Sequence, residues 1–118
     1  MEQNFGPYVR ERREARRQGD SLYSLRQLAL RLGIEPSYLS KVERGDVAPP
    51  SEATIVRLAG ELGEDADVLL ALAGKVSSDL QAVIRKRPEL FARLIREIRD
   101  MPDQAVLKLV REVRDGNW

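Results

Sequence analysis

Hydrophobic side chains recur along the chain at the three- and four-residue spacing of amphipathic helices, and no segment shows the sustained alternation of a β-strand. The pattern therefore predicts an all-α fold, with five helices before Gly74. The first covers about residues 4–17, with Phe5 and Val9 on its inner face and Gly19 as its expected C-cap.

The next two predicted helices are short and lie close together in the sequence. Ser24 begins the first of them, and Gln27 three residues later completes an S-x-x-Q capping box. Gly33 ends this helix, Pro36 occupies the first turn of the next, where its missing N–H costs nothing, and Gly45 ends that one. The apolar positions that this pair must bury are Leu28, Ala29, Leu32, Ile34, Leu39 and Val42. Two helices joined by so short a turn are typical of a helix-turn-helix.

Two further helices complete this region. A proline-containing extended connector leads to a helix that ends at Gly63, with Ser51 and Thr54 both candidates for its N-cap. Either Asp65 or Asp67 begins the fifth helix, which ends at Gly74. The apolar positions are Ile55, Leu58, Ala59 and Leu62 in the fourth helix and Val68, Leu69 and Leu72 in the fifth.

After Gly74 the helical pattern restarts, so we expect a joint between two domains, residues 1–74 and residues 75–118. The second part predicts two or three helices, beginning near Ser78, Pro88 and Pro102. Its main apolar rows are Leu90, Phe91, Leu94, Ile95 and Ile98, and then Val106, Leu109, Val110 and Val113. Two such helices can cover each other only in part, and a second subunit would cover the remaining surface. We therefore expect this segment to dimerise or to bind a protein partner; packing on residues 1–74 of the same chain remains an alternative.

Composition excludes several classes of enzyme. The 118 residues contain no Cys and no His, which removes disulfides, thiolate-bound zinc, cysteine nucleophiles and the Ser-His-Asp arrangement. The sequence also has no phosphate-cradling glycine-rich loop. We expect no enzymatic activity, no metal site and no cofactor. No apolar run approaches the roughly 20 residues of a membrane span, and Met1–Asn4 does not begin a signal peptide, so a cytoplasmic protein is expected.

Charge is unevenly distributed, although the formal net charge is only +1. Residues 1–50 hold nine Lys or Arg against seven Asp or Glu, residues 51–74 hold one against five, and residues 75–118 hold ten against seven. Any nucleic-acid contact must therefore come from a local basic patch. An architectural DNA binder without sequence preference is disfavoured by this balance.

The segment Ser24–Gly45, SLRQLALRLGIEPSYLSKVERG, resembles the helix-turn-helix of the Cro/C1-type (Xre-type) transcriptional regulators. The residues that carry the resemblance are Leu28-Ala29, Leu32-Gly33-Ile34, Pro36-Ser37-Tyr38-Leu39-Ser40 and Val42-Glu43-Arg44-Gly45, followed by Ala48-Pro49-Pro50-Ser51, Leu58-Ala59 and Leu62-Gly63. It covers about residues 4–74. It implies a five-helix bundle whose third helix lies in the DNA major groove.

The resemblance also implies which side chains face double-stranded DNA. These candidates are Arg26, Gln27, Pro36, Ser37, Tyr38, Ser40, Lys41 and Arg44. Lys41 is the best candidate for a base contact because lysine can donate to guanine O6 and N7. Arg26 and Gln27 begin the second helix, where side chains and backbone N–H groups meet the phosphate backbone. Tyr38 has an alternative role in half-buried packing.

Members of this family often pair an arginine of the first helix with the glutamate that corresponds to Glu43, and Arg13 is the expected partner here. Two departures from the family pattern concern the first helix. Arg12 replaces an apolar residue, and the link around Gly19–Ser21 is about three residues longer than usual. The helix-1 arginines are expected to be solvated more often than bound to DNA.

The resemblance, taken together with the apolar rows of residues 75–118, favours a dimeric repressor on a palindromic operator. An antitoxin-like regulator whose C-terminal helices hold another protein is the alternative.

Overall fold

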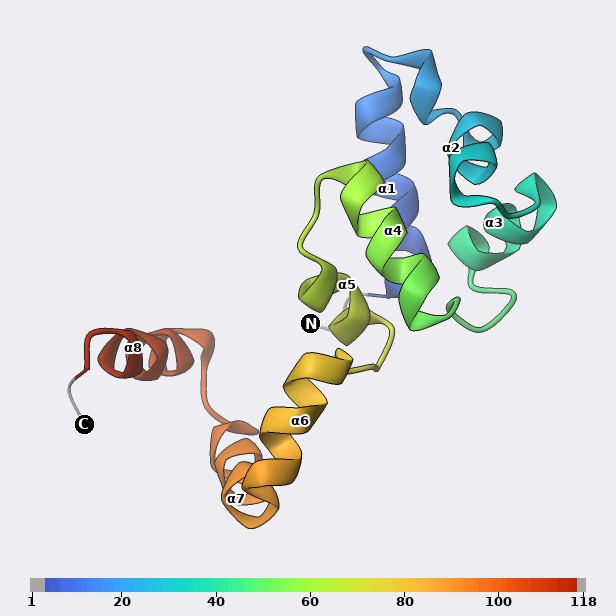
Figure 1. Cartoon of the computed structure of the whole chain (residues 1–118). Helices are drawn as coiled ribbons and strands as arrows, with labels where there is room; N and C mark the ends of the chain where they lie inside the picture. The colour runs from blue at the N-terminus through green and yellow to red at the C-terminus, as the bar shows by residue number, and fades with distance from the viewer. Residues whose placement is uncertain (1–3, 117–118) are drawn as a thin grey trace. The chain divides into compact units, whose positions relative to one another are not determined.

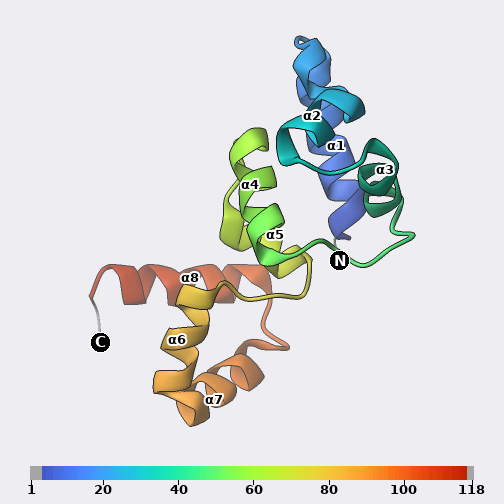
Figure 2. The same cartoon turned by 45° about the vertical axis from the view of Figure 1, so that its right-hand side comes forward.

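The computed structural model describes residues 4–116, and this range contains only helices, turns and extended connections. Its helices are α1 (Phe5–Arg17), the 3-10 turn η1 (Ser21–Tyr23), α2 (Leu25–Leu32), α3 (Pro36–Arg44), α4 (Glu52–Leu62), α5 (Ala66–Leu72), α6 (Ser78–Lys86), α7 (Pro88–Ile98) and α8 (Asp103–Arg114) (Figures 1 and 2). The predicted all-α class is confirmed. The chain divides into two compact units between Ser77 and Ser78.

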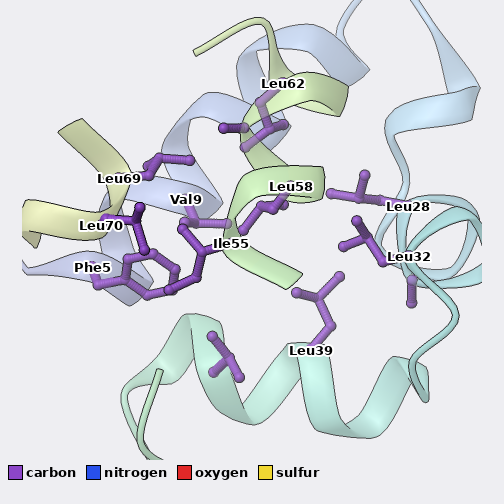
Figure 3. Packing of buried hydrophobic residues seen from close by; sticks show 13 residues of the cluster. Phe5, Val9, Leu28, Leu32, Leu39, Ile55, Leu58, Leu62, Leu69 and Leu70 are labelled. Atoms are coloured by element: carbon purple, nitrogen blue, oxygen red, sulfur yellow. The ribbon is translucent and has the colours of Figure 1, made fainter. Parts of the chain in front are cut away.

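The first unit is built around α4. Helices α1, α2 and α5 pack against it, and α3 packs against α1 and α2. Figure 3 shows apolar side chains from all five helices pointing toward one another. The buried hydrophobic side chains are Phe5, Val9, Leu28, Ala29, Leu32, Leu39, Val42, Ile55, Leu58, Ala59, Leu62, Leu69 and Leu70. The three-four periodicity thus selected most of the core correctly, because one stripe of each helix faces the same interior.

Helices α1 and α3 approach closely where α1 begins. A Cβ atom on Gly6 would meet the backbone carbonyl oxygens of Val42 and Glu43 at the end of α3. Glycine at this position therefore lets the backbones of α1 and α3 approach more closely than any larger residue would allow.

Four local details differ from the predictions. Gln18, just after α1, keeps right-handed helical backbone angles, and Gly19 is not among the glycines with positive φ. The Asp20 side chain instead accepts a hydrogen bond from the Leu22 N–H at 2.9 Å and begins η1. The capping box is only half formed, because the backbone N–H of Ser24 donates to the Ser21 carbonyl.

The other two differences concern helix register. In α5, Leu70 is buried and Val68 is exposed. Four of this helix's seven residues are large and apolar, so periodicity alone cannot select its inner face. The Asp65 side chain, which accepts from the Asp67 N–H at 2.8 Å, fixes where the helix begins. Pro102 precedes α8 in extended conformation, and α8 begins at Asp103.

The second unit contains α6, α7 and α8. Helices α6 and α7 pack against each other. None of the residues described in these three helices is buried. In the described part of the chain, every helix is too short or too polar to cross a membrane. The prediction about the first residues of the chain rests mainly on positions outside that part.

Candidate nucleic-acid interface

Local backbone chemistry sets the geometry of α2, the turn and α3. The Ser24 hydroxyl accepts a hydrogen bond from the Gln27 N–H at 3.2 Å and satisfies one of the unpaired donors at the start of α2. Gly33 ends α2 with φ of 70°, and Gly45 ends α3 with φ of 76°. Both values lie in the left-handed region that glycine adopts without steric cost. Pro36 stands in the first turn of α3, as predicted.

Helix α3 is buried along one side and open along the other. Leu39, Val42 and Glu43 are buried, whereas Ser37, Lys41 and Arg44 are exposed. The remaining predicted DNA-facing residues of this helix, Pro36, Tyr38 and Ser40, are half-buried. Tyr38 packs partly against the core, which agrees with its alternative role and leaves the rest of its side chain accessible.

The exposed polar side chains of α3 differ in whether they already form hydrogen bonds or ion pairs. The Arg44 guanidinium donates to the Ser40 hydroxyl at 3.1 Å and to the Asp46 carboxylate at 2.9 Å. Among the described residues, the Lys41 ammonium has no ion-pair or hydrogen-bond partner. Lys41 is therefore available for a ligand without breaking an existing interaction.

The start of α2 lies beside the start of α3. Arg26 and Gln27 line a surface hollow of about 320 Å³ together with Pro36. Leu30 lines the same hollow and is 72% exposed. Leu30 is not among the predicted DNA-facing residues, and its exposure beside Arg26 and Gln27 marks it as an apolar part of this face. A leucine at an outward position of a helix was the only sequence feature that could have indicated this role for Leu30.

A buried ion pair holds α3 against α1. The Arg13 Nε lies 2.7 Å from Glu43 Oε2, and Nη2 lies 2.9 Å from Oε1, so the pair is bidentate. Both residues are less than 5% exposed. The hydrogen bond to Glu43 is the main cause that raises the pKa of Arg13, against the opposing effect of burial. The arginine therefore stays charged throughout the neutral range.

Arg13 also reaches the longer link between α1 and α2. Its Nη1 donates to the Tyr23 carbonyl oxygen at 3.3 Å. The Tyr23 ring in turn lies near two guanidinium groups, with Arg16 at 5.4 Å and Arg31 at 5.3 Å from its centroid. Arg31 also donates to the Leu22 carbonyl at 2.6 Å. Leu22 and Tyr23, which follow the extra residues of this link, thus form a turn held by three arginines; we call it the braced turn, and the sequence did not predict it.

The second departure from the family pattern has a local explanation. Arg12 lies outside the core, with its guanidinium 4.9 Å from the Tyr8 ring centroid and 3.5 Å from the Glu64 carboxylate. The hydrogen bond and charge interaction with Tyr8 are the main causes that raise its pKa. Arg12 therefore ties α1 to the segment after α4 and leaves the recognition surface unaffected.

The predicted dimerisation residues remain accessible in the single chain. In α7, Leu90, Phe91, Leu94 and Ile95 are exposed, and Ile98 is half-buried. In α8, Val110 and Val113 are exposed, and Val106 and Leu109 are half-buried. A shallow hollow of about 200 Å³ lies between α6 and α7 and is lined by Val83, Ile84, Arg87, Leu90, Phe91 and Leu94. This apolar face is open to a partner.

Comparison with known proteins agrees with this geometry. A profile of the family described as Helix-turn-helix (HTH_3) matches residues 9–69, just over half of the chain. An uncharacterized HTH-type transcriptional regulator, RghRB, of Bacillus subtilis (strain 168) is 36% identical over 74 residues, which are 63% of this chain and 50% of that protein. The matched region thus spans about half the length of this relative. No solved structure gives a significant match. The described residues contain no group of acidic side chains arranged to hold a metal ion.

Proposed function

Because the chain belongs to the Cro/C1-type helix-turn-helix family, we propose that it binds double-stranded DNA in a sequence-specific manner and regulates transcription. The observation that carries the proposal is the open face of α3, whose polar side chains Ser37, Lys41 and Arg44 are exposed on a helix locked from behind by the Arg13–Glu43 pair. A recognition helix needs this combination of a fixed backbone and accessible donors. Its ligand would be chromosomal DNA, so we expect it to act in the cytoplasm.

The proposed contacts with DNA are of two kinds: some recognise bases, and the others bind the DNA backbone and fix the position of the protein on the duplex. Lys41, which has no partner among the described residues, is proposed to donate to a guanine in the major groove. Ser37 and Ser40 are proposed to contact base edges or phosphates, and Tyr38 a thymine methyl group or a phosphate. Arg26, Gln27, Pro36 and Arg44 frame this surface and would contact the DNA backbone.

Dimerisation through α7 and α8 is the second part of the proposal. The open apolar rows of these helices support it, because a second copy would remove them from water. A two-fold dimer carries two recognition helices about 34 Å apart, which matches a palindromic operator with half-sites one DNA turn apart. Occupancy of such an operator would repress transcription by blocking RNA polymerase.

The test of DNA reading is selection from a random-sequence duplex pool, followed by binding measurements with variants of the full chain. Enrichment of a palindrome is expected. Lys41→Ala should relax preference at one position of each half-site, whereas Arg26→Ala should weaken binding to all sequences alike. Absence of any enriched sequence would contradict the proposal. A loss of discrimination in Arg26→Ala with retained affinity would contradict the assignment of that residue to the backbone.

The test of dimerisation is sedimentation of the full chain and of Leu94→Asp. Leu94 is exposed in the single chain, so the substitution should leave the fold intact. The wild type should sediment as a dimer and the variant as a monomer with weaker operator binding. A wild-type monomer would favour the second candidate, a regulator whose open α7 and α8 rows hold a different protein, and a monomeric chain that enriches no DNA sequence would favour it further.

A further inference from the structure

The first unit contains a basic hollow, and two of the arginines that line it, Arg10 and Arg13, are not among the proposed DNA contacts. The hollow measures about 230 Å³ and lies between α1, the start of α2 and the end of α3. We call it the arginine hollow, and it is lined by Arg10, Arg13, Leu25, Ser40, Glu43 and Arg44. We infer that the arginine hollow binds a phosphate of the DNA backbone and that Arg10 of α1 is a DNA contact.

The charges around the hollow favour an anion. Three guanidinium groups and one carboxylate line it. The Glu43 carboxylate is already neutralised by its bidentate pair with Arg13. The remaining positive groups, on Arg10 and Arg44, thus face the hollow with no unpaired carboxylate among the lining residues. Asp46 contacts Arg44 from outside the lining, in an exposed pair that a phosphate can displace or share.

Within the part of the chain that the structure describes, no other interaction competes for the Arg10 side chain. Its natural helical partner four residues later is Glu14, but the Oε1 atom of Glu14 already lies 3.2 Å from Arg13 Nη2 and 3.9 Å from Arg17 Nη1. Among the described residues, Arg10 has no ion-pair or hydrogen-bond partner. An exposed arginine at the edge of a hollow, one helical turn before the buried Arg13, is free to close on an anion.

The hollow adjoins the proposed DNA surface. Ser40 and Arg44 line the hollow and also belong to the outward row of α3, and they are joined by a 3.1 Å hydrogen bond. Leu25 is the first residue of α2, so the positive end of that helix adjoins the hollow as well. A duplex seated on α3 would therefore bring a backbone phosphate to Arg10, Ser40 and Arg44 together. This inference rests on the proposed DNA binding.

The experiment measures binding of the full chain to a 30-base-pair random-sequence duplex as salt is raised from about 0.05 to 0.2 M. One lost phosphate contact makes the slope of log affinity against log salt shallower by about 0.9 and weakens binding about eightfold at 0.1 M. Arg10→Ala should show both effects, and Arg10→Lys should recover most of the slope. The matched control is Arg17→Ala, which removes an exposed arginine of the same helix outside the hollow and should leave the slope unchanged.

A second readout locates the contact. In a duplex that carries the sequence enriched by selection, ethylation of one particular phosphate should weaken wild-type binding, and ethylation of that phosphate should no longer weaken binding by Arg10→Ala. Equal slopes for Arg10→Ala and Arg17→Ala, or an unchanged interference pattern, would overturn the arginine hollow while leaving DNA binding by α3 intact. A wild-type chain that binds no duplex would overturn both this inference and the proposed function.

Discussion

Leu58 of α4 and Leu94 of α7 stand at similar places on amphipathic helices, yet the first is 1% exposed and the second is 48% exposed. In the first unit, α1, α2 and α5 pack against α4, and α3 packs against α1 and α2. The apolar stripe of each helix therefore packs against the apolar stripe of another helix. In the second unit, α6 covers only part of α7. Periodicity therefore predicts a helix equally well in both units, but it predicts burial only where the connections let several helices converge.

The largest contrast should appear on breaking the buried ion pair of the first unit. Glu43→Ala leaves the buried Arg13 guanidinium without its bidentate partner and with only the half-buried Glu14 carboxylate at 3.2 Å, which should lower the free energy of unfolding by about 3–5 kcal/mol. Asp46→Ala is the control, since it breaks an exposed pair and should cost about 0–1 kcal/mol. Urea unfolding followed by circular dichroism measures both. Equal costs would mean that the Arg13–Glu43 pair is not buried in solution.

The two leucines test the comparison directly. Leu58→Ala should lower the free energy of unfolding by about 2–5 kcal/mol, because it leaves a cavity among packed helices. Leu94→Ala removes an exposed side chain and should change the stability of the isolated chain by less than about 0.5 kcal/mol. Urea unfolding at dilute protein concentration separates these effects. A large loss for Leu94→Ala under those conditions would show that α7 is covered within its own chain.

Substitutions of two glycines in the first unit should have smaller effects on stability. Gly6→Ala should cost about 1–3 kcal/mol, because the new methyl group would press on the carbonyl oxygens of Val42 and Glu43. Gly60→Ala in α4 should instead stabilise by about 0.5–1 kcal/mol, because its Cβ position is open and alanine favours the helix. Thermal unfolding of the two variants should therefore shift in opposite directions. A shift in the same direction would contradict the close crossing of α1 and α3.

The smallest expected effect is that of pH on the ion pair. The pKa of Arg13 is higher in the folded chain than in the unfolded chain. The charged Arg13 side chain therefore contributes fully to the free energy of unfolding below the pKa of arginine in the unfolded chain, and this contribution is lost only as pH rises through the pKa in the folded chain. The stability difference between wild type and Glu43→Ala should therefore stay constant between about pH 7 and pH 10. Repeating the urea titrations across this range checks it, and a difference that shrinks before pH 10 would argue against a charged, bidentate pair.

The sequence predicted the helices well because caps and glycines are local signals. Ser24, Gly33, Pro36 and Gly45 define α2 and α3 through bonds and backbone angles within a few residues. The family resemblance supplied the Arg13–Glu43 pair, which joins residues far apart along the chain. Periodicity alone could not have selected this pair from the many charges of α1.

The remaining details depend on tertiary neighbours. The face of α5 stayed ambiguous because Val68, Leu69, Leu70 and Leu72 are all apolar, and only packing on α4 distinguishes them. The braced turn at Tyr23 depends on Arg16 and Arg31, which come from two different helices. The arginine hollow likewise joins α1 to α3, so nothing local distinguished Arg10 from its neighbouring arginines.

The closeness of Gly6 to the end of α3 also bears on sequence variation. Every other amino acid carries the Cβ atom that this crossing excludes, so substitutions at position 6 should be eliminated by selection wherever α1 keeps its angle to α3. Position 60, whose Cβ direction is open, carries no such restriction. Homologues that share this bundle should therefore keep glycine at the position of Gly6 and vary at the position of Gly60, and a homologue with a bulky residue at the former should carry a shifted first helix.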